Sequence, residues 1–339
     1  MWELFFTSLF VFTSFFNWMF IKTDMNSQVK SRAYFLPSLG EVIARSNAMF
    51  WLPKPSTIKK EVCVEVIAPS PTKHTDIEDF SLVASSGIAY DLKHDFYLFE
   101  KEADKSVPIA SISKLMAALV FLDHNPGWNA VYTINENDKR EGNKLNFFPG
   151  EQVLVRDLFY SALVASDNSA IISLVRSTKL NEGEFVAMMN SKASVLKMTN
   201  THFVEPTGLS ELNVSTARDV AKLVGEAMKD LDVRRAVLSD KYELEILNIK
   251  KNSKKNNKRV IRNTDSLLRS SDLSVKIVGG KTGYLNKAGY CFAGNFIKDD
   301  KEIITVILGA ESPEARFTET ERLLDWVFKN YDWPGQTKS

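Results

Sequence analysis

The segment Pro108-Ile109-Ala110-Ser111-Ile112-Ser113-Lys114-Leu115-Met116 opens a run, residues 111–123, that is apolar on nearly all sides. Such a run predicts a helix buried in a protein core. Ser111 and Lys114 are three residues apart, so they lie on one face of that helix. Ser111 also lies at the expected helix N-terminus, where backbone N–H groups and the helix dipole favour negative charge. A core helix that begins with a serine beside a lysine is therefore the starting point for the fold.

This serine and lysine can form a nucleophile and its base. A serine hydroxyl is a weak nucleophile and needs an adjacent base. A lysine amine is such a base when desolvation or a neighbouring cation lowers its pKa. The S-x-x-K pattern alone is weak, because about one copy is expected by chance in a chain of this length. Taken alone, Ser111 and Lys114 also fit a capping serine followed by a surface lysine.

A second polar group, Ala165-Ser166-Asp167-Asn168, follows an apolar helix expected over residues 154–164. A Ser and an Asn two positions apart can bring a hydroxyl and an amide together on a loop. The hydroxyl can relay a proton, and the amide can hold a substrate carbonyl. A plain helix-end turn is the alternative for this segment.

A third group, Val278-Gly279-Gly280-Lys281-Thr282-Gly283-Tyr284, begins a strand-like run. Glycines on a strand permit the close approach of another backbone or of a ligand. The positive charge of Lys281 and the hydroxyl of Thr282 suit a carboxylate ligand. Taken alone, the segment also fits a glycine-bulged edge strand.

Together the three groups are far more specific than any one of them. The order Ser111, Ser166, Lys281 corresponds to the motif set of penicillin-binding proteins and serine β-lactamases. Over residues 80–333 the chain resembles that superfamily, and within it the low-molecular-mass D-alanyl-D-alanine carboxypeptidase/endopeptidase family. The same resemblance extends to further segments: Pro149-Gly150-Glu151, Glu205-Pro206-Thr207-Gly208-Leu209, Ser215-Thr216-Ala217-Arg218-Asp219, Asn263-Thr264-Asp265 and Gly289-Tyr290-Cys291.

The strand and helix pattern predicts an α+β fold. Strands are expected over residues 81–84, 87–90, 96–99, 289–296 and 302–308, and an amphipathic helix over 318–331. Strands at both ends with helices between them indicate one sheet completed by N- and C-terminal pieces. The resemblance refines this to a β-lactamase/transpeptidase-like fold, in which helices flank an antiparallel sheet and an all-helical subdomain is inserted.

The resemblance implies a role for each residue of the first two motifs. Ser111 attacks the amide bond that follows a D-alanine and forms an acyl-enzyme, while Lys114 takes its proton. Ser166 carries a proton towards the leaving amine, and Asn168 orients the acyl side. Water then releases the acyl group.

The third motif is implied to hold the terminal carboxylate of the substrate through Lys281 and Thr282, with Gly283 and Tyr284 completing the binding set. Backbone N–H groups of Ser111 and Tyr284 are implied to form the oxyanion hole. Arg316 matches a family position that supports carboxylate binding, although it also fits a helix-start arginine.

Two other functions stay open. Glu205-Pro206 follows Asn168 in a way that faintly resembles the deacylating glutamate segment of class A β-lactamases, although Gly208-Leu209 fits the carboxypeptidase pattern better. A penicillin-binding fold can also act as a non-catalytic sensor of peptidoglycan or β-lactams. The favoured prediction is a serine D,D-peptidase, with peptidoglycan stem peptides as substrates and β-lactams as covalent inhibitors.

Composition excludes several other classes of function. The 43 Lys and Arg residues balance 42 Asp and Glu residues, so the charge needed to hold nucleic acid is lacking. Two cysteines, Cys63 and Cys291, exclude a disulfide-dense scaffold. The four histidines form no metal-binding spacing. The resemblance likewise implies neither a cofactor nor a metal.

The chain ends are expected to lie outside the catalytic domain. Residues 1–21 are apolar enough for a signal anchor or signal peptide, and 22–77 form a tether that contains five of the 11 prolines. The D,D-peptidase domain is expected over 78–333, followed by a tail, 334–339. Attachment through the N-terminal segment predicts a place on the extracytoplasmic face of the membrane. Lys22, Lys30 and Arg32 follow the apolar run and conflict with that orientation.

A basic run between Lys250 and Arg262 has two interpretations. Its lysines and arginines are separated by Asn and Ser, which favours an exposed, solvated loop. Contact with an anionic polymer of the cell envelope is the alternative.

Overall fold

The computed structural model describes residues 69–75, 77, 79–142, 146–249 and 257–334. The predicted signal segment (1–21) and most of the tether lie outside these residues. Among the described residues, no helix is both long and apolar enough to cross a membrane.

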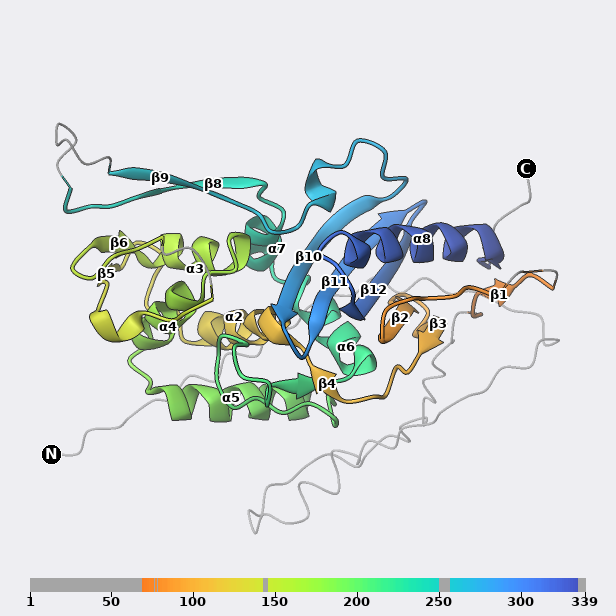
Figure 1. Cartoon of the computed structure of the whole chain (residues 1–339), viewed down its shortest axis with the longest axis horizontal. Coiled ribbons are helices and arrows are strands. Elements are labelled where there is room, and N and C mark those ends of the chain that lie inside the picture. The colour runs from red at the N-terminus through yellow and green to blue at the C-terminus, as the bar shows by residue number, and fades with distance from the viewer. Residues whose placement is uncertain (1–68, 76, 78, 143–145, 250–256, 335–339) are drawn as a thin grey trace, which may run out of the picture. The chain divides into compact units, whose positions relative to one another are not determined.

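A five-stranded antiparallel sheet in the order β10-β11-β12-β2-β3 forms the centre of the fold (Figure 1). Its strands are β2 (Ser86–Asp91), β3 (Phe96–Lys101), β10 (Lys276–Leu285), β11 (Gly289–Lys298) and β12 (Lys301–Ala310). The early strand β2 pairs with the late strand β12, with Ile88 opposite Val306. The expected sheet built from both ends of the chain is therefore confirmed.

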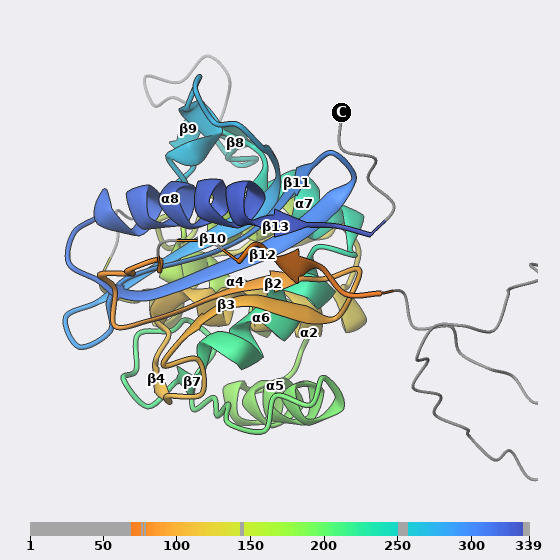
Figure 2. The same cartoon turned by 90° about the vertical axis from the view of Figure 1, so that its right-hand side faces the viewer.

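The two faces of this sheet pack against different helices. Side chains of a strand point alternately to opposite faces. On β12, Ile303 and Ile307 belong to the core under α8 (Ala315–Asn330), whereas Ile304 and Val306 belong to the core shared with the inserted helices. Figure 2 shows α8 on one face of the sheet, with α2 and α6 on the other. The sheet is thus buried on both faces.

The chain between β3 and β10 forms the insertion. Its helices are α2 (Ser113–Asp123), α3 (Val155–Val164), α4 (Asn168–Ser177), α5 (Glu182–Val195), α6 (Ala217–Ala227) and α7 (Leu231–Val237), with 3₁₀ turns η1 (Ala110–Ile112), η2 (Glu136–Asp138) and η3 (Leu267–Arg269). Nine of the eleven residues of α2 are buried, as its apolar sequence predicts. The α+β fold is confirmed.

The resemblance implies an all-helical insertion, but the insertion is not entirely helical. It also contains three two-stranded sheets: β4 (Val107–Pro108) with β7 (Val214–Ser215), β5 (Val131–Thr133) with β6 (Gln152–Leu154), and β8 (Lys241–Glu245) with β9 (Lys258–Arg262). These strands are two to five residues long. Strands that short carry too little alternation to be read from sequence.

Residues 81–84 do not form the strand that their pattern predicts. Leu82 and Ala84 are buried and Val83 is 60% exposed, which is the alternation of a strand. Their backbone groups pair instead with side chains, because Lys101 Nζ donates to the carbonyls of Leu82 (2.7 Å) and Ala84 (2.9 Å). Burial alternates here without a neighbouring strand.

The two ends of the described fold meet. β1 (Thr72–Lys73) pairs with β13 (Tyr331–Asp332), directly after α8. α8 begins at Ala315, where Ser312 Oγ accepts the backbone N–H at 3.0 Å, three residues earlier than the sequence indicates. The three borders between the expected segments stay predictions, but β1 ties part of the expected tether to the last strand.

The basic run is only partly described, since residues 250–256 lie outside. Lys258–Arg262 form strand β9 instead of a solvated loop. In that strand Lys258 pairs with Glu243, and Arg259 pairs with Glu151. Part of the positive charge is therefore neutralised within the fold, while contact with an anionic polymer stays a prediction.

Candidate active site

A cavity of about 430 Å³ lies between β10 and the insertion. Its volume is typical of small-ligand sites. It is lined by Ser111, Gly142, Ser166, Asn168, Gly208, Leu209, Glu211, Thr264, Thr282, Gly283, Tyr284, Leu285, Asn286 and Arg316. Lys114 and Lys281 lie directly beneath this lining, each 2.9 Å from the hydroxyl of a lining serine. The structure therefore brings together all nine residues that the sequence singled out.

Ser111 lies in η1, two residues before α2 begins. Ala110, which precedes it, has a left-handed backbone with φ +48°. Two glycines fit closely against this turn. A Cβ on Gly208 would lie 2.1 Å from the carbonyl oxygen of Ala110, and one on Gly283 would lie 2.9 Å from that of Ile109. The backbone of Ser111 is thus held between strand β10 and the loop that contains Gly208.

Lys114 is fully buried and makes three hydrogen bonds. Its Nζ donates to Ser111 Oγ (2.9 Å), Asn168 Oδ1 (2.6 Å) and the carbonyl oxygen of Thr207 (2.5 Å). Burial lowers the pKa of Lys114 to about 7, although the nearby carboxylates of Glu205 and Asp167 act in the opposite direction. A large fraction of this amine is therefore neutral near pH 7 and can accept the proton of Ser111.

Ser166 lies between α3 and α4, and Asn168 is the first residue of α4. Ser166 has φ +56°, so its backbone is in the left-handed region that non-glycine residues rarely adopt. Asp167 caps α4 by accepting the N–H of Ala170 at 3.0 Å. Asn168 donates from Nδ2 to the carbonyl oxygen of Glu141 (2.8 Å), which leaves Oδ1 to face Lys114. This segment is more than a plain helix-end turn, because the Ser166 hydroxyl contacts Lys281 and the Asn168 amide oxygen contacts Lys114.

Lys281, on β10, is also buried, and its Nζ donates to Ser166 Oγ (2.9 Å) and to the carbonyl oxygen of Thr282 (3.1 Å). Burial, followed by the charges of Lys114 and Arg316, holds the pKa of Lys281 well below its usual value. The positive charge expected at Lys281 is therefore less stable here than on an exposed lysine. An incoming carboxylate would favour its protonated form.

Arg316, on α8, reaches the same wall of the pocket. Its Nη1 donates to the carbonyl oxygen of Gly283 at 3.2 Å, and its buried Nε has no hydrogen-bond partner. Burial lowers the pKa of this guanidinium. Tyr284, which is 48% exposed, stacks on Tyr290 with the ring centroids 4.3 Å apart. The arginine thus supports the end of β10 and is more than a residue at a helix start.

Several pocket groups were not recognised as functional in the sequence. Thr264 lines the cavity, and its Oγ1 lies 2.6 Å from Thr282 Oγ1. Its segment, Asn263-Thr264-Asp265, had a recognisable family pattern but no assigned role. Thr207 contributes a backbone carbonyl, which leaves no signal in a sequence. Burial raises the pKa of the Cys291 thiol to about 11, which makes it a poor nucleophile near neutral pH.

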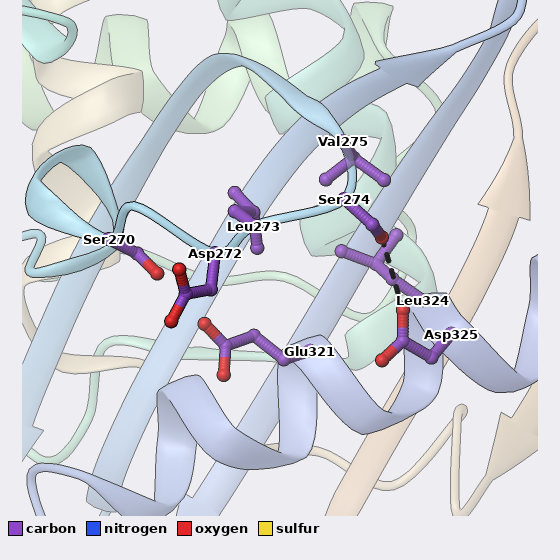
Figure 3. A pocket seen from close by; sticks show the side chains of 8 residues that line it. All are labelled: Ser270, Asp272, Leu273, Ser274, Val275, Glu321, Leu324 and Asp325. Carbon is purple, nitrogen blue, oxygen red and sulfur yellow. Dashed lines mark hydrogen bonds between the residues drawn. The ribbon is translucent and has the colours of Figure 1, made fainter.

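A second cavity, of about 230 Å³, lies between η3, the start of β10 and α8 (Figure 3). It contains the carboxylates of Asp272, Glu321 and Asp325. Burial raises the pKa of Glu321, and the two aspartates add to the effect. Neither a lysine nor an arginine lines this cavity, so it lacks the nucleophile–base pair of the first. In the described ranges, no group of three or more His, Cys, Asp or Glu residues is arranged to hold a metal ion.

Comparisons with known proteins agree with this geometry. Residues 72–312 match the family model described as D-alanyl-D-alanine carboxypeptidase. The chain is 32% identical to a D-alanyl-D-alanine endopeptidase of Pseudomonas aeruginosa, over 73% of this chain and 77% of the relative. It is 30% identical to the Escherichia coli endopeptidase over the same shares of both chains. Among solved structures, the Streptomyces K15 DD-transpeptidase superimposes with a TM-score of 0.67 at 25% identity, over 75% of this chain and 100% of that one.

Proposed function

The chain belongs to the D-alanyl-D-alanine carboxypeptidase family and is a serine D-alanyl-D-alanine peptidase, and from that premise we propose how its pocket works. Ser111 Oγ attacks the carbonyl carbon of a D-alanine residue, at the amide bond that follows it, and becomes acylated. The observation that carries this proposal is the buried Lys114 Nζ, 2.9 Å from Ser111 Oγ and with a pKa of about 7. That amine takes the hydroxyl proton as the new C–O bond forms.

The leaving amine then needs a proton. Ser166 Oγ lies 2.9 Å from Lys281 Nζ, so its hydroxyl can pass a proton to the amine and recover one from the lysine pair. Asn168 holds the acyl side through its amide. Backbone N–H groups of Ser111 and Tyr284 stabilise the oxyanion. Water afterwards cleaves the ester and regenerates the Ser111 hydroxyl.

The carboxylate next to the scissile bond binds at the end of β10. Lys281 and Thr282 supply an ammonium and a hydroxyl, and Gly283 lets the strand pass close to η1. Arg316 adds a second positive charge, held by the carbonyl oxygen of Gly283. A β-lactam carries a carboxylate and a reactive amide at a similar separation, so it acylates the same serine.

We favour cross-linked peptides over free D-alanyl-D-alanine ends as the preferred substrate. Support comes from the relatives in Pseudomonas aeruginosa and Escherichia coli, both of which are named endopeptidases. In both substrates the scissile amide follows a D-alanine, so the same catalytic groups serve.

The test is digestion of purified monomeric and cross-linked muropeptides, with products identified by mass. Conversion of cross-linked dimers to monomers is expected, at a higher kcat/KM than release of D-alanine from monomers. Ser111→Ala is the control and should be inactive on both and unlabelled by penicillin. An adduct on another peptide, or labelling of Ser111→Ala, would contradict the assignment of Ser111.

A peptidase of peptidoglycan acts outside the cytoplasm, and we further propose that residues 1–21 keep this one at the membrane. The apolar composition of that segment supports the proposal. A β-lactamase reporter fused after residue 80 should protect cells, and the full-length fusion should sediment with membranes. Protection lost in a fusion that begins at residue 22 would support export by the segment. A protein found only in the cytoplasm would contradict it.

A further inference from the structure

Glu205 lies outside the cavity lining, but its carboxylate gathers five hydrogen bonds from the loop that follows it. Oε2 accepts the backbone N–H and the hydroxyl of Thr207, both at 2.6 Å. Oε1 accepts the backbone N–H groups of Gly208 (2.6 Å) and Ser210 (3.2 Å) and the amide of Asn213 (3.0 Å). Hydrogen bonds to a charged acceptor are the strong ones. A single carboxylate therefore organises this loop.

Two groups of the loop touch the catalytic residues directly. The carbonyl oxygen of Thr207 accepts from Lys114 Nζ at 2.5 Å. Gly208 packs on the peptide that joins Ala110 to Ser111, so closely that an added Cβ would lie 2.9 Å from the N atom of Ser111. The loop thus fixes the base from one side and the nucleophile from another.

We propose that Glu205 is a positioning residue, whose carboxylate sets the place and the charge environment of Lys114 and Ser111 through the loop 205–213. This inference rests on the proposed roles of those two residues. Glu205 does not act on water, because its oxygens are committed to the loop. This distinguishes it from a deacylating glutamate, which needs a free carboxylate facing the acyl-enzyme.

The charge of Glu205 also matters for Lys114. The ionisable groups that face Lys114 are Glu205 on the loop, Asp167 before α4 and Lys281 on β10. The two carboxylates favour the protonated amine, and the lysine opposes it. Removing the charge of Glu205 takes away one of the two carboxylates that favour protonated Lys114. The repulsion from Lys281 is then less well balanced, so the pKa of Lys114 should fall further. The acid limb of the pH profile of acylation then moves to lower pH.

The test compares Glu205→Gln with Glu226→Gln, the same chemical change at a partly exposed position on α6 that pairs with Lys229. The second-order rate constant for acylation by a fluorescent penicillin is measured from pH 5 to 10, per active site titrated. For Glu205→Gln the plateau should fall about 100-fold, because displacements of the order of 1 Å at a catalytic group cost that much. Its acid limb should shift to lower pH. Glu226→Gln should match the wild type.

Thr207→Val separates the effect of loop geometry from the effect of the Glu205 charge. It also keeps the proposal testable if Glu205→Gln folds poorly. It removes the hydroxyl bond to Glu205 Oε2 and the acceptor of the Leu209 N–H, but keeps the carboxylate charged. Its plateau should fall about tenfold while its acid limb stays in place. The proposal is overturned if Glu205→Gln loses only thermal stability and keeps the wild-type plateau and limb, or if Thr207→Val acylates at the wild-type rate. Failure of the wild-type protein to acylate at Ser111 would instead refute the proposed function.

Discussion

The two walls of the catalytic pocket are built in different ways. Lys281 and Thr282 stand on β10 beyond its bulge at 277–279, in regular register with Ala293 and Phe292 of β11. Ser111 and Ser166 stand at turns, beside or within left-handed residues, Ala110 (φ +48°) and Ser166 (φ +56°). Left-handed backbone at non-glycine residues persists only where its surroundings enforce it. The wall that binds charge thus uses ordinary sheet geometry, while the wall that moves protons depends on strained turns and on the contacts that hold them.

The largest loss of activity is expected on the turn wall, from Lys114→Ala. Removal of the base should lower the rate of acylation by about 10²- to 10⁴-fold. It also leaves Asn168 Oδ1 and the Thr207 carbonyl without their donor. Stopped-flow acylation by a fluorescent penicillin measures the loss. Lys114→Met is the control for volume and should be equally slow. If Lys114→Met retained most of the rate, the base would have to be another group.

A methyl group tests how much each wall tolerates. Gly208 has φ +84°, and its added Cβ would lie 2.1 Å from the Ala110 carbonyl oxygen, so Gly208→Ala should displace Ser111 and lower acylation about 100-fold. On the sheet wall, the Cβ added by Gly283→Ala would lie 2.9 Å from the carbonyl oxygen of Ile109, so this variant should lose less of the acylation rate. Both variants are compared by acylation rate and by circular dichroism. A larger loss in Gly283→Ala would reverse the proposed contrast between the walls.

On the sheet wall, Lys281→Ala should lower acylation by about 10- to 150-fold, through the loss of one charge-assisted hydrogen bond to the ligand carboxylate. Lys281→Arg keeps a positive charge but presents a planar fork, so it should retain part of the activity. The fold should be unchanged by circular dichroism. Wild-type acylation by Lys281→Ala would show that the carboxylate binds elsewhere.

The smallest expected effect concerns the shape of the pH profile. Acylation should rise through the pKa of Lys114, about 7, because only the neutral amine can accept a proton. It should fall again at alkaline pH as Lys281 loses its proton, and well before an ordinary lysine would, because its pKa is lowered. Arg stays protonated, so Lys281→Arg should lose this alkaline limb and keep the acid one. An unchanged alkaline limb in Lys281→Arg would assign that limb to another group.

The sequence predicts the two walls unequally. On the sheet wall, Lys281 and Thr282 are expected on a strand-like run whose glycines permit close approach, and they lie on β10. On the turn wall the motif residues were identified, but the contacts that hold them were not. The contact of Lys114 with the Thr207 carbonyl, and most of the hydrogen bonds to Glu205, involve backbone groups. Every residue type has such groups, so the sequence does not show which of them make these contacts. Residues 81–84 show the opposite error: the sequence predicts a strand there, but two of the backbone carbonyls accept hydrogen bonds from Lys101 Nζ and none of these residues belongs to a strand.

The strand order has a consequence for how the protein is made. β2 and β3 are synthesised early, yet β2 pairs with β12, which begins about 200 residues after β3 ends. Translation at about 5–20 residues per second delays that partner by tens of seconds. During this interval the apolar strand β2 has one open edge and cannot complete its sheet, so the nascent chain is exposed to aggregation and to proteases. A chaperone that binds extended apolar segments, or export of the chain before it folds, would protect the strand until its partner arrives.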